Sequence, residues 1–166
     1  MNRQEIYTSY LERFKKDLVA NYDKLGLRAS GKFEEELQGE IQRSKANTTK
    51  LIMWGAPYSN NLERGRSKNR NTTNELKDAI EGWIEVKRGL PAIFVEKKKQ
   101  FAFIIARKIA KEGIKVPNEH NAGKVISDVA ILYLGEYLFK MMEEIGTDFL
   151  KEVDFQADFR NILNVK

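Results

Sequence analysis

The sequence predicts an α+β protein in which a small antiparallel sheet is packed by an N-terminal helix and two central helices, with a long helix near the C-terminus. Three observations favour this class. Apolar residues recur every three or four positions over residues 6–25, as on the buried face of a helix. Apolar and polar residues then alternate over residues 33–42, and an apolar run follows at residues 51–54, as in strands. A wide helical apolar face returns over residues 123–153.

The first helix and the sheet are separated by a stop signal. Gly26 follows the N-terminal helix, and glycine is common just after a helix C-terminus. Residues 33–43 and 49–54 are the predicted arms of an antiparallel hairpin, and the second arm is the core strand. The Glu-rich start of the first arm is also compatible with a helix.

The core strand is closed by a turn and followed by a polar loop. Gly55 and Pro57 end the strand, and residues 58–64 restart as a short helical piece that Gly65 ends. Residues 65–73 contain no apolar side chain, so we expect an exposed, mobile loop there.

Two central helices come next. The first is capped by Thr73 or Asn74 and extends to residue 88, and the second spans residues 92–112 with an interruption at a Lys cluster. Gly113 ends the second helix, and residues 114–117 form a short extended piece that could add an edge to the sheet.

Length and composition are those of an ordinary folded domain. The 166 residues, of which 42% are apolar, fit one domain over residues 1–153, followed by a tail or arm over residues 154–166. The chain has no cysteine, which excludes disulfides and thiolate metal sites. We find no signal-peptide pattern and no apolar run long enough to cross a membrane, and expect a soluble, non-secreted protein.

Charge is distributed unevenly along the chain. The net charge is +5, yet seven basic residues stand against Glu63 alone over residues 43–70, whereas eight acidic residues stand against Lys140 and Lys151 over residues 125–158. This asymmetry suits head-to-tail contact between copies as well as it suits nucleic-acid binding, and charge alone leaves both open.

The residue types that catalysis needs do not converge in the sequence. His120 is the single histidine and lies beside Glu119 in a polar segment, which favours an exposed loop residue over a metal ligand or a catalytic relay. No phosphate-binding loop or dinucleotide motif is present. The sequence therefore predicts no enzyme, no catalytic or metal-binding residue and no cofactor.

Residues 51–66, Leu-Ile-Met-Trp-Gly-Ala-Pro-Tyr-Ser-Asn-Asn-Leu-Glu-Arg-Gly-Arg, resemble the head-tail joining, tail-completion or neck proteins of tailed bacteriophages. In that family a strand runs into a Tyr-containing turn, a Glu-x-Gly-Arg-like element, a variable loop, a helix with a Trp and a helix ending near a Gly. The corresponding residues here are Trp54, Tyr58, Glu63, Gly65, Arg66, Trp83 and Gly113. The resemblance covers about residues 33–113 and leaves the C-terminal third unexplained.

The resemblance implies a structural virion protein that forms a ring in the neck or tail and joins the portal or adaptor to the tail around the DNA channel. By analogy the ring holds on the order of six or twelve copies. Its partners are portal, adaptor and tail proteins and passing double-stranded DNA, with no membrane, and assembly takes place in the host cytoplasm. The alternative is a basic nucleic-acid-binding accessory protein, although no known DNA-binding motif is present.

Three sets of residues are the candidate functional positions. Trp54 and Trp83 are expected to be buried near each other, because the short connection folds helix back on sheet. The basic loop is expected to face a neighbouring subunit or DNA, and its members are Arg64, Arg66, Lys68 and Arg70. The last helix, about 45 Å long, exceeds what a small core needs. Its expected oligomer face is Leu138, Met141, Met142 and Ile145.

Overall fold

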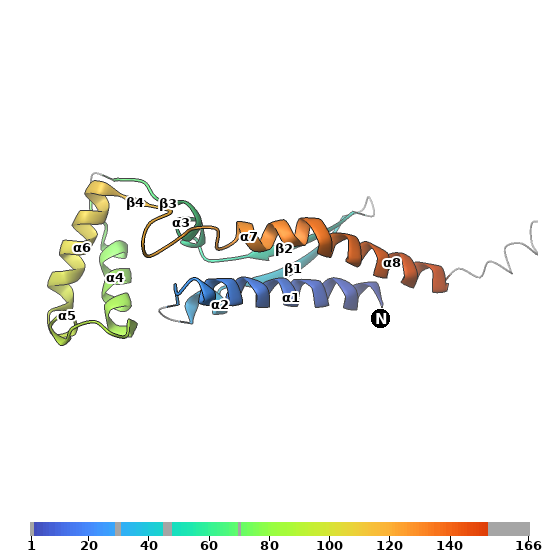
Figure 1. Cartoon of the computed structure of the whole chain (residues 1–166), viewed down its shortest axis with the longest axis horizontal. Coiled ribbons are helices and arrows are strands. Elements are labelled where there is room, and N and C mark those ends of the chain that lie inside the picture. Colours follow the sequence, from blue (N-terminus) through green and yellow to red (C-terminus); the bar gives the residue numbers. More distant parts are fainter. Residues whose placement is uncertain (1, 29–30, 45–47, 70, 153–166) are drawn as a thin grey trace, which may run out of the picture.

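The computed structural model describes residues 2–28, 31–44, 48–69 and 71–152. The described chain is elongated, with α1 (Arg3–Lys24) and a C-terminal helical segment (residues 127–152) side by side along the long axis (Figure 1). A hairpin of β1 (Gln38–Arg43) and β2 (Thr49–Trp54) packs on α1. At one end, helices from residues 74–112 stand across this axis (Figure 1). The predicted α+β class is confirmed.

A reciprocal pair of hydrogen bonds begins α1. The backbone N–H of Glu5 donates to the side-chain oxygen of Asn2 at 2.9 Å, and the backbone N–H of Asn2 donates to the Glu5 carboxylate at 2.8 Å. Two donors that a helix start would otherwise leave unpaired are thereby satisfied. The helix ends at Lys24 and is followed by Gly26 in a left-handed conformation, as predicted.

The hairpin is shorter than the sequence suggested. Its register runs from Gln38 opposite Trp54 to Arg43 opposite Thr49. The prediction of a strand from residue 33 was wrong at its start, where α2 (Lys32–Glu35) forms a helical turn. Phe33 and Leu37 are four residues apart, so a helical turn brings both side chains to the same side, and both are buried.

The main core lies between α1, α2 and the start of the C-terminal helical segment. The rings of Tyr22 and Phe33 stack with their centroids 4.4 Å apart. Met53 from β2 and Leu62 pack on the edge of this cluster. Its buried members are Leu18, Tyr22, Phe33, Leu37, Val125 and Val129.

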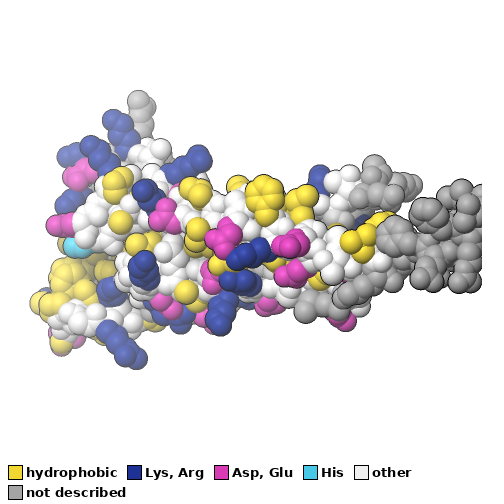
Figure 2. Space-filling model, turned by 45° about the vertical axis from the view of Figure 1, so that its right-hand side comes forward, with side chains coloured by type: hydrophobic (Ala, Val, Ile, Leu, Met, Phe, Trp, Pro, Cys, Tyr) yellow, Lys and Arg dark blue, Asp and Glu magenta, His cyan; other side chains and the backbone are white. Residues whose placement is uncertain are grey.

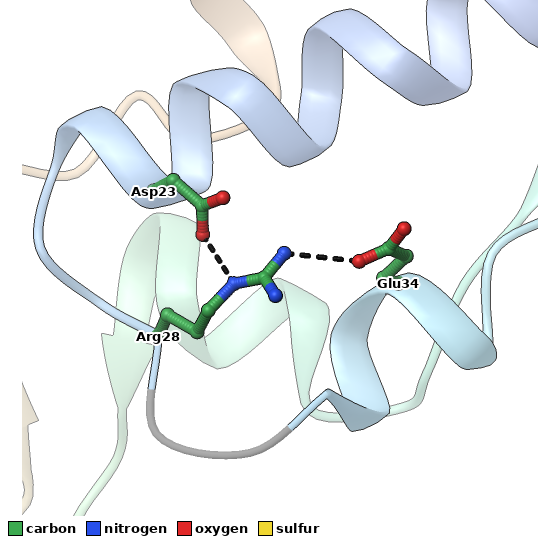
Figure 3. A network of polar contacts seen from close by, with 3 residues as sticks. All are labelled: Asp23, Arg28 and Glu34. Atoms are coloured by element: carbon green, nitrogen blue, oxygen red, sulfur yellow. Dashed lines mark hydrogen bonds and ion pairs between the residues drawn. The ribbon is translucent and has the colours of Figure 1, made fainter.

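Arg28 closes the connection between α1 and α2. Its guanidinium donates to Asp23 at the end of α1 at 2.6 Å and to Glu34 of α2 at 2.9 Å (Figure 3). The three side chains are about half exposed, so this network links the end of α1 to α2 but contributes little stability.

The central helices form a second buried cluster. Ile80 and Ile84 of α4 (Asn74–Val86) pack against Ala102 and Ala106 of α6 (Lys98–Glu112), and the small alanines let the two helices approach closely. The short helix α5 (Ala92–Glu96) joins them. Thr73 caps α4 as predicted, since its hydroxyl oxygen accepts from the N–H of Leu76 at 3.3 Å. These helices pack on each other and build a core of their own.

The chain enters and leaves this helical unit where two short strands pair, and we call this pairing the crossing. There β3 (Gly65–Arg66), directly after α3 (Ser59–Arg64), pairs antiparallel with β4 (Ile114–Lys115). Gly65 has φ +79°, and a Cβ on it would overlap the carbonyl oxygen of Ile114. Gly113 has φ +76°, and a Cβ there would lie 2.5 Å from the carbonyl oxygen of Arg66. Both positions therefore require glycine. The extended piece after Gly113 pairs with this segment instead of the hairpin.

The C-terminal segment is one long helical run. It consists of α7 (Ser127–Leu132), the π-helical turn η1 (Tyr133–Tyr137) and α8 (Leu138–Glu152). At 1.5 Å per residue it is about 39 Å long. It begins later than the predicted residue 123. Gly135 lies within the π-helical turn, and no neighbouring atom approaches the position of its missing Cβ.

Polar and aromatic contacts hold this segment against α1. The hydroxyl of Tyr133 donates to Asp17 at 2.8 Å, and burial together with this bond raises the pKa of the Tyr133 phenol. Arg13 donates to the hydroxyl of Tyr137 at 2.9 Å, and its guanidinium carbon lies 4.1 Å from the centre of that ring. The two helices therefore run antiparallel, with one side of the C-terminal segment against α1.

The crossing generates a stability prediction. We expect backbone strain alone to make Gly65→Ala less stable than the wild type by about 1–3 kcal/mol, because glycine alone adopts this backbone conformation without strain. The overlap with Ile114 adds to that cost. Urea unfolding followed by circular dichroism measures the difference.

Gly82→Ala is the matched control. Gly82 lies inside α4, and an added Cβ there meets nothing within 4 Å. Because alanine has the higher helix propensity, this variant should gain up to about 1 kcal/mol. Equal stabilities for the two variants would contradict the role assigned to the crossing.

Candidate assembly surfaces and a cationic pocket

Glu63 links α3 to the start of α7. Its carboxylate accepts from the backbone N–H of Ile126 at 2.9 Å and from the hydroxyl of Ser127 at 2.5 Å. The residue before α7 supplies no side-chain cap of its own. Glu63 therefore caps this helix from a distant part of the chain, and its negative charge is favourable near the positive end of the helix dipole.

The pKa of Glu63 reflects these contacts. Partial burial raises it, but the hydrogen bonds from Ile126 and Ser127 favour the charged form and leave the pKa below its ordinary value. Nearby, the side-chain amide of Asn121 donates to the carbonyl of Leu62 at 2.8 Å. The segment that precedes α7 is thus attached to α3 through both backbone and side-chain groups.

The Glu-x-Gly-Arg element consequently has a structural explanation. Glu63 caps α7, and Gly65 permits the crossing with β4. Tyr58, just before α3, packs on the main core, and burial, with a smaller effect of Glu36, raises its pKa to about 12. These motif residues organise the fold around the end of β2.

The two tryptophans do not form the buried pair that we predicted. Trp54 is 55% exposed, and its indole N–H donates to Glu40 across the hairpin at 2.5 Å. Trp83 is 38% exposed on α4, whose buried face is made by Ile80 and Ile84. The prediction was wrong because the helices after β2 pack on each other and leave the end of the strand open.

The basic loop is held in place by backbone contacts, in contrast to the predicted mobile loop. Arg66 lies in β3, and the backbone N–H of Asn69 donates to the carbonyl of Ala110 in α6 at 2.7 Å. Arg64 and Lys68 are exposed, whereas Arg66 is half-buried. Arg70 lies outside the described residues. The crossing, which the sequence did not reveal, anchors the loop without any apolar side chain.

Anchoring the loop creates an open pocket beside the end of α6. Its volume is about 630 Å³, and its lining consists of Lys68, Asn69, Thr72, Arg107, Ala110 and Lys111. Three of these side chains are cationic and none is anionic. Dark-blue Lys and Arg side chains gather at the upper left of Figure 2, over the end of the molecule where β3 and β4 cross.

A second surface lies on the outward side of the C-terminal helical segment. Leu134 is 73% exposed and Phe139 72% exposed, and a row of hydrophobic side chains runs over this region in Figure 2. Of the predicted oligomer face, Leu138 and Met142 are exposed, whereas Met141 and Ile145 are half-buried. We call this surface the apolar stripe; its large exposed side chains are Ile131, Leu132, Leu134, Leu138, Phe139, Met142 and Leu150.

An apolar groove adjoins the apolar stripe. It has a volume of about 400 Å³ and lies between α1, β2 and the C-terminal helical segment. Leu51 and Met53 line it from β2, and Leu134, Leu138 and Met141 line it from the opposite side. The stripe and groove together form one continuous apolar region, because Leu134 and Leu138 belong to both.

The described residues offer little for other chemistry. His120 is exposed and pairs with Glu119 at 3.1 Å, as expected for a loop histidine. Within the described ranges, no group of three His, Asp or Glu side chains is placed to hold a metal ion. Among the same residues, no helix combines the length and apolar character required to cross a membrane.

We compared the chain with known protein families, curated proteins and solved structures. None of them matches it. Its function must therefore be inferred from these surfaces themselves.

The Glu63 cap generates a pH-dependent prediction. We expect Glu63→Gln to lower the free energy of unfolding by about 1–2 kcal/mol at pH 7, because charge-assisted hydrogen bonds are stronger than neutral ones. The pKa of Glu63 is lowered in the folded state, so its contribution is present above the unfolded-state pKa and is lost as the pH falls through the folded-state value. The difference between wild type and variant should therefore shrink below about pH 4.

Glu119→Gln is the control for this measurement, since Glu119 is highly exposed and pairs with the equally exposed His120. Urea unfolding at pH 7 and at acidic pH should reveal no comparable loss for that variant. A Glu63→Gln difference that grew toward acidic pH would contradict the assigned cap.

Proposed function

We propose that the chain is a structural, non-enzymatic subunit of a ring in the neck or tail of a tailed bacteriophage, where it joins the head to the tail around the DNA channel. The observation that carries this proposal is the apolar stripe. Monomeric proteins seldom leave so many large apolar side chains on one helix, and such a surface marks an interaction site, which this proposal assigns to the neighbouring subunit.

The length of the helical segment supports a subunit interface. One of its sides packs on α1, and on the outward side Leu134 and Phe139 keep almost three quarters of their surface exposed. A helix of about 39 Å offers a continuous strip for a neighbour. Specific interfaces bury more than about 1,000 Å² in total, which a strip of this length and the adjoining groove can supply.

Charge supports a head-to-tail arrangement of the copies. Acidic side chains lie along the C-terminal helical segment, among them Glu143, Glu144 and Asp148, whereas the pocket beside α6 is cationic. A ring needs two different surfaces that meet, one from each neighbour. The acidic, apolar surface of the C-terminal helical segment is one of these two surfaces, and its charge would steer association with cations of the next copy that lie outside the pocket.

The resemblance of residues 51–66 supplies the kind of assembly. In this proposal the ring, on the order of six or twelve copies, contacts the portal or adaptor and tail proteins in the virion. Within this chain, Glu63 caps α7 and Gly65 permits the close approach to β4, so both motif residues have structural roles that do not depend on the loop beyond them.

The second candidate function is a nucleic-acid-binding accessory protein, favoured by the cationic pocket. Mass measurement and sedimentation of the purified protein, with and without a portal-side partner, separate the two. A ring subunit should form a closed oligomer, and its association should weaken as salt screens the charges. A strict monomer that binds DNA tightly at physiological salt would favour the accessory role.

A double variant tests the apolar stripe directly. We expect Leu134→Ser with Phe139→Ser to leave the fold intact, since both side chains are exposed, and to abolish assembly. Each buried apolar side chain contributes about 1.5–3 kcal/mol, so losing two weakens every interface by about 3–6 kcal/mol. Sedimentation and native mass spectrometry measure the oligomer.

The control replaces exposed apolar residues outside the stripe. Ile93→Ser with Val95→Ser makes the same chemical change on α5, which is far from the stripe along the chain. This variant should assemble like the wild type. Unimpaired assembly of the Leu134/Phe139 variant would remove the main support for the proposed interface.

A further inference from the structure

The cationic pocket brings together side chains from distant parts of the sequence. Arg107 and Lys111 are four residues apart on α6 and lie on one face of that helix. Lys68 comes from the loop after β3 and lines the same pocket. Asn69 and Thr72 add neutral polar groups. The lining therefore combines three cations with neutral donors and acceptors.

Backbone contacts set the position of Lys68. The N–H of Asn69 is bonded to the carbonyl of Ala110 at 2.7 Å, and Arg66 is paired with Ile114. At Gly113 the two backbones approach so closely that a Cβ would lie 3.0 Å from the nitrogen of Lys68. The loop is therefore placed against α6 before any ligand arrives, and a preorganised site loses less entropy on binding.

The arrangement is electrostatically unfavourable without a partner. Three positive charges line one pocket whose lining includes no carboxylate, and like charges separated by less than a Debye length repel each other. A neighbouring depression shares Arg107 and Lys111 and adds Lys108; the rest of its lining is Glu112 and the exposed apolar residues Phe103 and Ile104. The cationic surface thus continues along α6 beyond the pocket.

We infer that this surface binds the phosphodiester backbone of double-stranded DNA without reading its sequence. An extended row of Lys and Arg matches a ligand that carries many phosphates, and phosphate contacts of this kind are sequence-independent. The lining is open and exposed, which suits an extended backbone better than a single small anion. The inference rests on the proposed function only for the choice of DNA as the polyanion.

The test compares two triple variants of the full chain that lose equal charge. The first is Lys68→Ala, Arg107→Ala and Lys111→Ala; the control is Lys16→Ala, Lys24→Ala and Lys32→Ala, which removes cations of α1 and α2. Fluorescence anisotropy of a labelled DNA duplex measures affinity between about 50 and 200 mM salt. Circular dichroism verifies that both variants are folded.

We expect the pocket variant to lose at least about tenfold in affinity at the lower salt concentration, and the control to change by less than about threefold. The slope of log affinity against log salt should become shallower by about 0.9 for each phosphate that the variant no longer neutralises, and therefore by up to about 2.7. Equal losses in the two variants would show that net charge alone attracts DNA, and would overturn the inference. A wild type that binds no DNA would also overturn it.

Two further measurements exclude a small-anion site and an effect of oligomer size. Inorganic phosphate should displace DNA no better than chloride at equal ionic strength; specific displacement by phosphate would identify a small-anion site and overturn the inference. Both triples are also made in the Leu134→Ser/Phe139→Ser background, so that differences in oligomer size do not enter. If the wild type stays monomeric, and DNA affinity is lost in the pocket variant but not in the control, the proposed ring is contradicted and the proposed DNA site is supported.

Discussion

The close approach of two backbone segments at Gly65 and Gly113 is the constraint on which most of the structure depends. Only residues without a Cβ can occupy these positions, and they allow β3 and β4 to pair where the chain enters and leaves the central helices. This contact joins two buried clusters that otherwise have separate sets of core residues. It also places the loop after β3 on the end of α6, which is where the cations converge.

Glu63 extends the influence of this crossing to the far side of the molecule. It lies two residues before Gly65, and its carboxylate accepts hydrogen bonds from Ile126 and Ser127 at the start of α7. The direction of the C-terminal helical segment is then maintained along α1 by the contacts of Tyr133 and Tyr137. Glu63 and Gly65, shortly after β2, thus help to position both the cationic pocket and the apolar stripe. Neither residue is itself part of those surfaces.

Local sequence patterns predicted the elements well and their tertiary relations poorly. The periodicity and glycine stop of α1, the Thr73 cap and the arms of the hairpin were readable because each depends on neighbours a few residues away. Burial of Trp54 was expected because a short connection would fold the next helix back on the sheet, yet the strand end is open and the indole N–H donates to Glu40. Lys68 and Arg107 line one pocket because of the crossing, and no pattern among neighbouring residues predicts that they lie together. The one sequence signal for the crossing is that Gly65 and Gly113 each end a helix. The length of the last helix indicated more apolar surface than a small core needs, and several of its large apolar side chains are exposed in the described chain.

The crossing has a further consequence for how the chain can vary. Because β3 and β4 are hydrogen-bonded neighbours, the central helices begin and end at adjacent points, and they bury their apolar residues mainly among themselves. Topologically they form an insertion into a body made of α1, the hairpin and the C-terminal helical segment (Figure 1). Such a unit can be lengthened, shortened or exchanged without re-registering a strand or opening the main core. Divergence in length is therefore best accommodated between residues 67 and 112, while the flanking glycines stay in place.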